Sequence, residues 1–320
     1  MKSFIVKLLI FCSGFVIMER VALYFLPSLR PIDYRLFIES KTDFFKKQHD
    51  VDILIFGDSQ IADAMDTRIL ENNCGRKSYN LAIYHTSPFE QYYIIQSAVN
   101  HLKKKPEIVI LGTNPRMFEM DLTKGRFTSI ILRQDLKMNY QFGINSNEGL
   151  DPSFFFGTLN EKYLFTDWFS RQLNGRKYMP VREIVSVYNG HLEFYNQLDV
   201  DWEVFEDNGE SKFFDEQVGY FIKTIEFLKS HNLEILIVNP PIWPLEVEFL
   251  STTENYRKFQ AILEKISNDY RISIYNPDFN FNDINLERRD YLNTTHLNYY
   301  GCSKYTNHFS GYLRGIIAIN

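Results

Sequence analysis

The stretch Val51–Gln60, VDILIFGDSQ, limits the fold of this chain more than any other stretch. Its apolar residues Ile53–Phe56 follow one another without a polar interruption, which is typical of a strand buried on both faces of a parallel sheet. A glycine ends this run, and Asp58 and Ser59 come next. Because ligands of open α/β sheets lie beyond the carboxyl ends of the strands, Ser59 is a candidate nucleophile. The alternative is that both polar residues only cap the helix expected over 60–73.

Further strands and helices alternate along the chain. Apolar runs predict strands over 78–83, 106–113, 233–239 and 272–275, and amphipathic periodicity predicts helices over 89–103, 215–231, 254–270 and 303–316. This order is typical of parallel sheets whose strands are joined by crossover helices. We therefore expect a doubly wound α/β domain with a mainly parallel sheet over residues 51–320.

The alternation stops between residues 117 and 214. This segment is rich in aromatic residues, such as Phe155, Trp168 and Trp202, and it has little regular period. Long loops inside a compact domain are usually functional, and a high aromatic content disfavours disorder. We predict an insertion packed over the upper edge of the sheet, where the aromatic rings would either fill a core or stack on sugar rings.

Residues 1–27 predict a membrane anchor, followed by a connector over 28–50. The segment Phe4–Leu26 is mostly apolar, and it is long enough to cross a bilayer if Lys7 and Arg20 reach the interfaces with their long side chains. The lysines before the span would keep the N-terminus cytoplasmic and place the rest of the chain outside. A cleaved signal peptide and a buried core helix are the alternatives, but no small-residue cleavage site is evident.

Composition argues against several other classes of function. The formal net charge is −5, and the only basic block is Lys103-Lys104-Lys105, so a nucleic-acid partner is not expected. The three cysteines are far apart and odd in number, which argues against a disulfide framework and against a zinc site built from paired cysteines. The sequence implies no cofactor and no metal.

Four polar groups follow successive strands or lie in the last loop: Ser59, the turn Asn80–Ala82, Asn114 and His296. A nucleophilic serine needs a base within hydrogen-bond reach and donors aimed at the oxyanion that develops during attack. These residues are of the right types. Each alone has a simpler explanation, as a turn residue or a surface histidine, so their order along the chain and their places at strand ends carry the hypothesis.

The same residues give the chain a resemblance to a known family. Gly57-Asp58-Ser59, Gly112-Thr113-Asn114 and His296 resemble the ordered motifs of the SGNH (GDSL-type) hydrolase superfamily, over roughly residues 51–116 and 215–316. The resemblance implies a three-layer α/β/α fold. The run His296–Gly301, the strand end Asn239-Pro240-Pro241 and the N-terminal anchor are similar to the membrane-anchored branch. That branch includes the D-alanyl transfer protein of teichoic acid synthesis and polysaccharide O-acetylation proteins.

The resemblance implies that Ser59 is the nucleophile and His296 the general base. It makes Asn114 an oxyanion-hole donor beside the Ser59 backbone N–H. Ala82 stands where many members have glycine, and its backbone N–H could serve as a further donor although its φ is more restricted.

The larger departure from the family is Asn293, three residues before His296, where an Asp usually orients the imidazole. An Asn oxygen can hold the ring but has no charge to stabilise an imidazolium. Three catalytic options follow: a weakened triad through Asn293, a Ser-His dyad held by a backbone carbonyl, or a displaced acid at Asp290. Loss of activity is the fourth outcome.

The resemblance implies an extracytoplasmic, membrane-anchored serine esterase or O-acyltransferase. It would act on acyl groups of a cell-envelope glycan through an acyl-enzyme on Ser59, with an acylated glycan or an acyl donor as its partner. The alternative is a catalytically weakened scaffold subunit that partners a membrane-bound O-acyltransferase. A soluble metabolic α/β protein is a third reading, which the hydrophobic N-terminus disfavours.

Overall fold

The computed structural model describes residue 41 and residues 45–84, 86–120, 212–276 and 278–319. The predicted anchor over 1–27, most of the connector and most of the insertion over 117–214 lie outside these residues. In the part of the chain that the structure describes, no helix combines the length and the apolar character needed to cross a membrane.

A five-stranded parallel sheet forms the centre of the fold, and its strand order is β2-β1-β3-β4-β5. The strands are β1 (Ile53–Phe56), β2 (Ser78–Asn80), β3 (Ile108–Gly112), β4 (Glu234–Val238) and β5 (Ser273–Tyr275). All residues of β1 and β3 are buried, as their unbroken apolar sequence predicts. The predicted α/β fold with a parallel sheet is confirmed.

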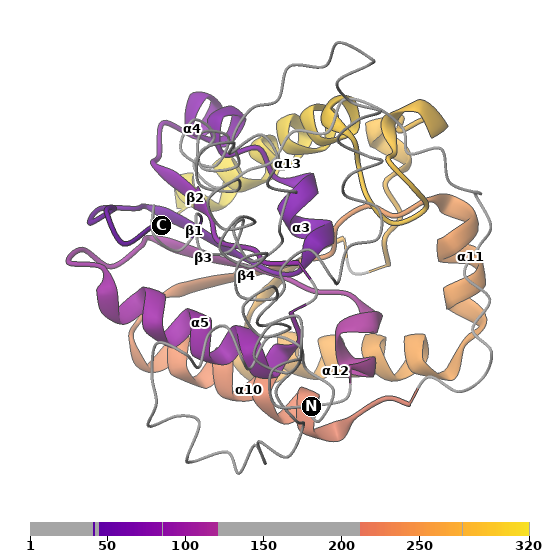
Figure 1. Cartoon of the computed structure of the whole chain (residues 1–320), viewed down its shortest axis with the longest axis horizontal. Helices are drawn as coiled ribbons and strands as arrows, with labels where there is room; N and C mark the ends of the chain where they lie inside the picture. The colour runs from indigo at the N-terminus through magenta and orange to yellow at the C-terminus, as the bar shows by residue number, and fades with distance from the viewer. Residues whose placement is uncertain (1–40, 42–44, 85, 121–211, 277, 320) are drawn as a thin grey trace, which may run out of the picture. The chain divides into compact units, whose positions relative to one another are not determined.

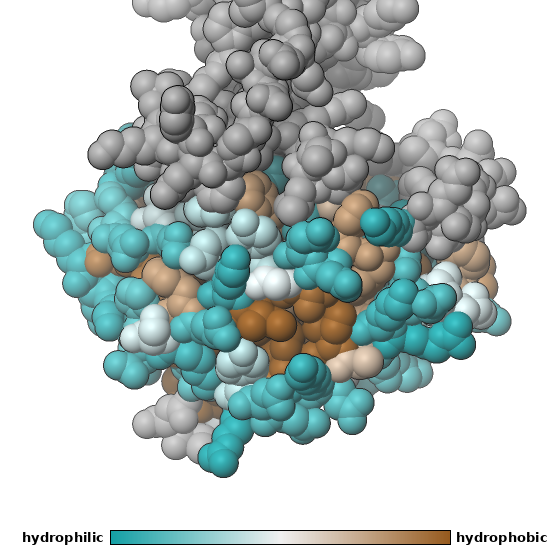
Figure 2. All heavy atoms as spheres, turned by 90° about the horizontal axis from the view of Figure 1, so that it is seen from below, coloured by the Kyte–Doolittle hydropathy of each residue, from teal (hydrophilic) through white to brown (hydrophobic). Residues whose placement is uncertain are grey.

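Helices cover both faces of this sheet (Figure 1). One face carries α3 (Ser59–Ala64), α4 (Thr67–Cys74) and α13 (Tyr299–Ile319), and the other carries α5 (Pro88–His101), α10 (Asp215–Ser230) and α12 (Glu254–Tyr270). Further elements are α11 (Pro244–Thr252), η2 (Pro115–Glu119), η5 (Asn282–Ile284) and η6 (Arg288–Asp290). Seen from below in Figure 2, the surface is largely hydrophilic around a small apolar area, as expected where amphipathic helices turn their polar sides outward.

The helix predicted over 60–73 is in fact two helices. Met65 has an extended backbone, with φ −116° and ψ 102°, and ends α3. Asp66 then starts α4, because its side chain accepts the backbone N–H of Arg68 at 2.9 Å. The carbonyl of Met65, which the break frees, accepts the Asn80 amide at 3.0 Å. Local capping therefore overrides the continuous amphipathic pattern.

Two glycines let α3 pack directly on the ends of β1 and β3. A Cβ atom at Gly57, whose φ is 155°, would lie 2.8 Å from the Cβ of Ile61, and one at Gly112 would lie 1.8 Å from its Cγ1. Neither distance is compatible with a side chain. Glycine at these two positions therefore allows the first turn of α3, which carries Ser59, to lie close to the sheet.

The end of the predicted connector is part of the packed domain. Phe45 is buried and its ring lies 5.3 Å from that of Tyr79 in β2. Lys41 is fully buried, and its backbone carbonyl accepts the Tyr79 hydroxyl at 2.7 Å. Residues that precede the first strand therefore cover the β2 edge of the sheet.

Candidate active site

The candidate site lies where the strand order of the sheet reverses. In the order β2-β1-β3-β4-β5, the chain leaves β1 toward one side for β2 and returns to the other side for β3. Ligands in doubly wound sheets bind in the crevice that this reversal leaves at the carboxyl ends of the strands. Ser59 follows β1 and Asn114 follows β3, so the topology places both at the edges of that crevice.

Asp58 caps α3, and Ser59 is the first residue of that helix. The Asp58 carboxylate accepts the backbone N–H of Gln60 at 3.0 Å. The capping interpretation of Gly-Asp-Ser is thus true for Asp58, and it leaves Ser59 available for chemistry. The N–H of a first helical residue has no intrahelical acceptor, so the Ser59 backbone N–H is a donor at the site.

His296 lies within hydrogen-bond distance of Ser59, as the predicted nucleophile and base require. Its Nε2 is 2.8 Å from the Ser59 Oγ, although 237 residues separate the two in sequence. On the other side of the ring, Nδ1 is 3.0 Å from the Asn293 Oδ1. Ser59, His296 and Asn293 therefore form a continuous chain of hydrogen-bond contacts.

The Asn293 oxygen is fixed by the local backbone. It accepts the backbone N–H groups of Thr295 at 2.9 Å and His296 at 3.0 Å. Two N–H donors require the oxygen, and not the NH₂ group, at this position. The His296 Nδ1 lies 3.0 Å from this oxygen, and the tautomer that donates Nδ1–H to it leaves Nε2 as the acceptor that a general base needs. An amide flip, which would favour the wrong tautomer, is incompatible with these backbone contacts.

Thr295 is a neighbour of the base that sequence reasoning missed. Its hydroxyl lies 2.9 Å from the His296 Nδ1 and donates to the Asn293 Oδ1 at 3.2 Å. The sequence offered a weak signal, since a hydroxyl residue directly before a catalytic histidine is within reach of its ring. Thr295 thus adds a second polar contact behind the imidazole.

Asp290 faces a different partner. Its carboxylate pairs with Lys304 at 2.7 Å and accepts the Glu287 backbone N–H at 2.8 Å, and the residue is buried. The ring nitrogen of His296 that an orienting acid would contact is instead next to Asn293. This geometry does not support the hypothesis of a displaced acid at Asp290.

The Asn114 side chain is buried and held at both ends. Its Nδ2 donates to the Asp58 carboxylate at 2.7 Å, and its Oδ1 accepts the Met117 backbone N–H at 3.3 Å as the cap of η2. The amide orientation is therefore defined, and one N–H of Nδ2 is left for another acceptor. Asp58 is thus a supporting residue that sequence reasoning had treated only as a cap.

Ala82 has both backbone polar groups engaged. Its N–H donates to the Asn80 Oδ1 at 3.0 Å, and its carbonyl accepts the Lys41 ammonium at 2.5 Å. In this arrangement the Ala82 N–H points to a side chain of its own turn. Its role as an oxyanion donor stays a prediction, and Ser59 N–H and Asn114 Nδ2 are the two donors that the geometry favours.

A tight loop presents His296. Tyr291 and Leu297 form an antiparallel bridge, and the Leu292 N–H donates to the His296 carbonyl at 2.8 Å. The loop is tied to the segment after β4, because the Trp243 N–H donates to the Thr294 carbonyl at 2.7 Å. These backbone contacts fix the base independently of its own side chain.

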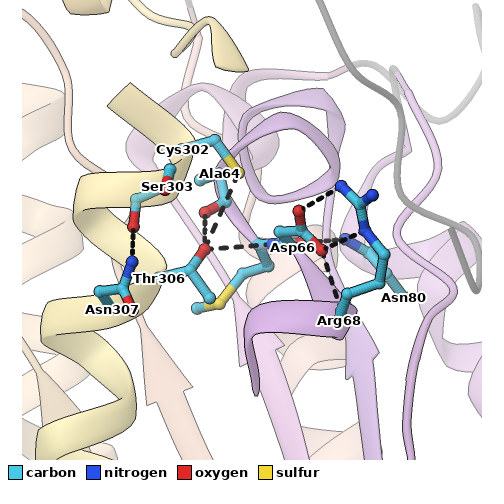
Figure 3. A network of polar contacts seen from close by, with 9 residues as sticks. Ala64, Asp66, Arg68, Asn80, Cys302, Ser303, Thr306 and Asn307 are labelled. Atoms are coloured by element: carbon cyan, nitrogen blue, oxygen red, sulfur yellow. Dashed lines mark hydrogen bonds and ion pairs between the residues drawn. The ribbon is translucent and has the colours of Figure 1, made fainter. Parts of the chain in front are cut away.

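A buried polar network fixes α13, which begins three residues after the base, against the end of α3 (Figure 3). The Thr306 hydroxyl donates to the Ala64 carbonyl at 3.0 Å and accepts the Asp66 backbone N–H at 3.1 Å. Because α3 carries Ser59 and α13 follows the loop of His296, this network supports the spacing between Ser59 and His296.

No metal-binding cluster is found within the described residues, since no three His, Cys, Asp or Glu side chains there could share an ion. Asp58 and His296 are each engaged in the hydrogen bonds described above.

Comparisons with known proteins give loose likenesses. A protein-family model that carries no functional description matches residues 203–317, less than half of the chain, and no curated protein matches the sequence. A protein from Bacteroides fragilis named as an acylhydrolase is similar in structure, with 9% identity, a TM-score of 0.41, and coverage of 88% of this chain and 95% of that one. A GDSL-like lipase from Bacteroides thetaiotaomicron has 9% identity, a TM-score of 0.40 and coverage of 89% and 98%. Likeness of this degree carries no argument about activity, so the proposal below rests on the site itself.

Proposed function

We propose that the chain is a serine esterase or O-acyltransferase that forms an acyl-enzyme on Ser59. The observation that carries the proposal is the 2.8 Å contact between the Ser59 Oγ and the His296 Nε2, in a ring whose Nδ1 lies 3.0 Å from the Asn293 oxygen. A serine hydroxyl in contact with a correctly oriented imidazole is the arrangement that activates serine for acyl transfer.

Each step of the reaction has a residue for it. His296 Nε2 takes the proton of Ser59 as the Oγ attacks the acyl carbonyl, and it returns that proton to the leaving alkoxide. The oxyanion of the tetrahedral intermediate accepts hydrogen bonds from the Ser59 N–H and the remaining Asn114 N–H. Water or a second hydroxyl group then attacks the acyl-enzyme by the same route, which gives hydrolysis or transfer.

Fluorophosphonate labelling tests this proposal directly. The probe reacts with serines that have an activating base, so we expect one labelled residue, Ser59, identified by peptide mapping. Labelling should disappear after Ser59→Ala. A folded protein that does not react with the probe would favour the alternative, a scaffold subunit that partners a membrane-bound O-acyltransferase.

We further propose that the substrate is an acyl group on a cell-envelope glycan and that the domain acts outside the cytoplasm. This part rests on the sequence of residues 1–27 and on the family resemblance. The full-length chain should fractionate with membranes and keep its N-terminus. A mature protein whose N-terminus lies beyond residue 20 would replace the anchor with a cleaved signal and leave the export proposal intact.

Replacement of Asn293 by Asp should increase turnover. The added carboxylate would accept the same two backbone N–H groups, which keep a carboxylate ionised at neutral pH. It would stabilise the imidazolium that forms as His296 takes the proton. We expect kcat for an activated ester to rise by about ten-fold, or roughly 1.4 kcal/mol in the barrier.

The matched control for this charge is Asn307→Asp on the exposed side of α13, which should leave kcat unchanged. Asp290→Asn tests whether Asp290, and not position 293, supplies the acid. It removes the carboxylate that pairs with Lys304 and should lower stability without altering the pH dependence of turnover. A lower kcat in Asn293→Asp would show that the amide NH₂ of Asn293, and not its oxygen, serves the reaction.

A further inference from the structure

A buried charged cluster lies behind the nucleophile, and the mechanism above does not use it. Lys41 is fully buried, and its ammonium group donates to the Ala82 carbonyl at 2.5 Å. Asp63, four residues after Ser59, is 3% exposed and accepts the hydroxyl of Tyr84. The cluster therefore joins three segments: the connector, the loop after β2 and the helix of the nucleophile.

Lys41 and Asp63 each influence the ionisation of the other. Burial lowers the pKa of the Lys41 ammonium to about 7, and the Asp63 carboxylate opposes that shift. Burial raises the pKa of Asp63 to about 8, while the hydrogen bond from Tyr84 and the charge of Lys41 oppose that rise. A buried charge is unfavourable without a compensating opposite charge. Removal of one of the two groups would therefore leave the other buried without that compensation.

The loop that Lys41 holds is adjacent to the candidate active site. The Ile83 N–H donates to the Gly57 carbonyl at 2.9 Å, two residues before Ser59. The Ala82 N–H is bound to Asn80, so the carbonyl contact with Lys41 fixes the other side of the same residue. Movement of this loop would move the backbone from which α3 begins.

We propose that Lys41 is a positioning residue for the acyl transfer proposed above: its side chain holds the loop of residues 81–84 and so keeps Ser59 aligned with His296 and the oxyanion donors. The inference rests on the proposed function and adds a residue from the segment that precedes the α/β domain. Small displacements of a reacting atom reduce the rate of catalysis without requiring loss of substrate binding. The role therefore predicts an effect on kcat and little effect on KM.

The test compares two double variants of the full-length chain, each without a charge at positions 41 and 63; they are called the Gln pair and the Met pair. Lys41→Gln with Asp63→Asn keeps a neutral donor toward the Ala82 carbonyl, whereas Lys41→Met with Asp63→Asn removes it. Both pairs avoid an unpaired buried charge, and Asn at position 63 can still accept the Tyr84 hydroxyl. Lys41→Met alone removes a positive charge that favours the buried Asp63 carboxylate and should lower the melting temperature, so the double variants are the ones compared.

We expect both pairs to fold and the Gln pair to have a kcat for an activated aryl ester about ten-fold above that of the Met pair, at similar KM. Equal kcat in the two pairs, or wild-type kcat in the Met pair, would overturn the role of Lys41. Fluorophosphonate labelling of the wild-type chain is measured in parallel. If wild-type Ser59 is not labelled, the proposed function fails; if it is labelled and the pairs do not differ, only the inference about Lys41 fails.

Discussion

Replacement of Ser59 or His296 by alanine should reduce kcat/KM for a simple ester by on the order of 10⁴-fold or more, the size of effect known for serine-histidine enzymes. In the proposed reaction Ser59 supplies the atom that forms the acyl-enzyme, and His296 is the only base at hydrogen-bond distance from it among the described residues. In that reaction the two residues would act as one unit. The double variant should therefore lose about as much activity as either single variant, because the second replacement removes a group that no longer has a role.

Ser251→Ala is the matched control for the serine replacement. Its hydroxyl is exposed and donates to the Glu248 carbonyl of α11 at 2.7 Å, remote from the base in sequence and in hydrogen bonding. It should leave kcat/KM unchanged. Full turnover in a folded Ser59→Ala variant would show that another group is the nucleophile, and additive losses in the double variant would show that serine and histidine act in separate steps.

The sheet and the order of the site residues were predictable from sequence for a simple reason. A strand buried on both faces must be apolar throughout, so Ile53–Phe56 and the later apolar runs can be recognised as strands from the sequence alone. A parallel sheet brings the carboxyl ends of its strands to one edge, which is why residues after β1 and β3 meet. The same logic explains why the pairing of Ser59 with a histidine near the C-terminus could be proposed before any distance was known.

Features that depend on individual side-chain contacts were not predictable from sequence. The break at Met65 depends on a cap by Asp66 and on the distant Asn80 amide, and an amphipathic pattern contains neither. The burial of Lys41 contradicts the usual placement of lysine at the surface, and it depends on partners distant in sequence, such as the Ala82 carbonyl. The direction of the Asn293 oxygen was also open, because the amide can turn either way until the backbone donors are known.

Removal of the Asn114 side chain should have the second largest effect, a loss of about 10²–10³-fold in kcat. Asn114 Nδ2 is the side-chain donor proposed here for an oxyanion at Ser59, and its contacts with Asp58 and the Met117 N–H hold it in place before substrate binds. A donor that is already oriented stabilises the transition state without reorganisation. Since the oxyanion exists only during reaction, Asn114→Ala should lower kcat while KM changes little.

The loss in Asn114→Ala has a second explanation, because alanine also removes the cap of η2. Asn114→Asp separates the two. The aspartate keeps an oxygen for the Met117 N–H, but it has no N–H for the oxyanion and places a second carboxylate against Asp58, at a position where the amide now lies 2.7 Å away. If Asn114 acts as an oxyanion donor, the Asp variant should lose at least as much kcat as the Ala variant even where it folds. If the Asp variant retains wild-type kcat, the cap is the whole role of Asn114 and the oxyanion must be held by the Ser59 N–H with another donor.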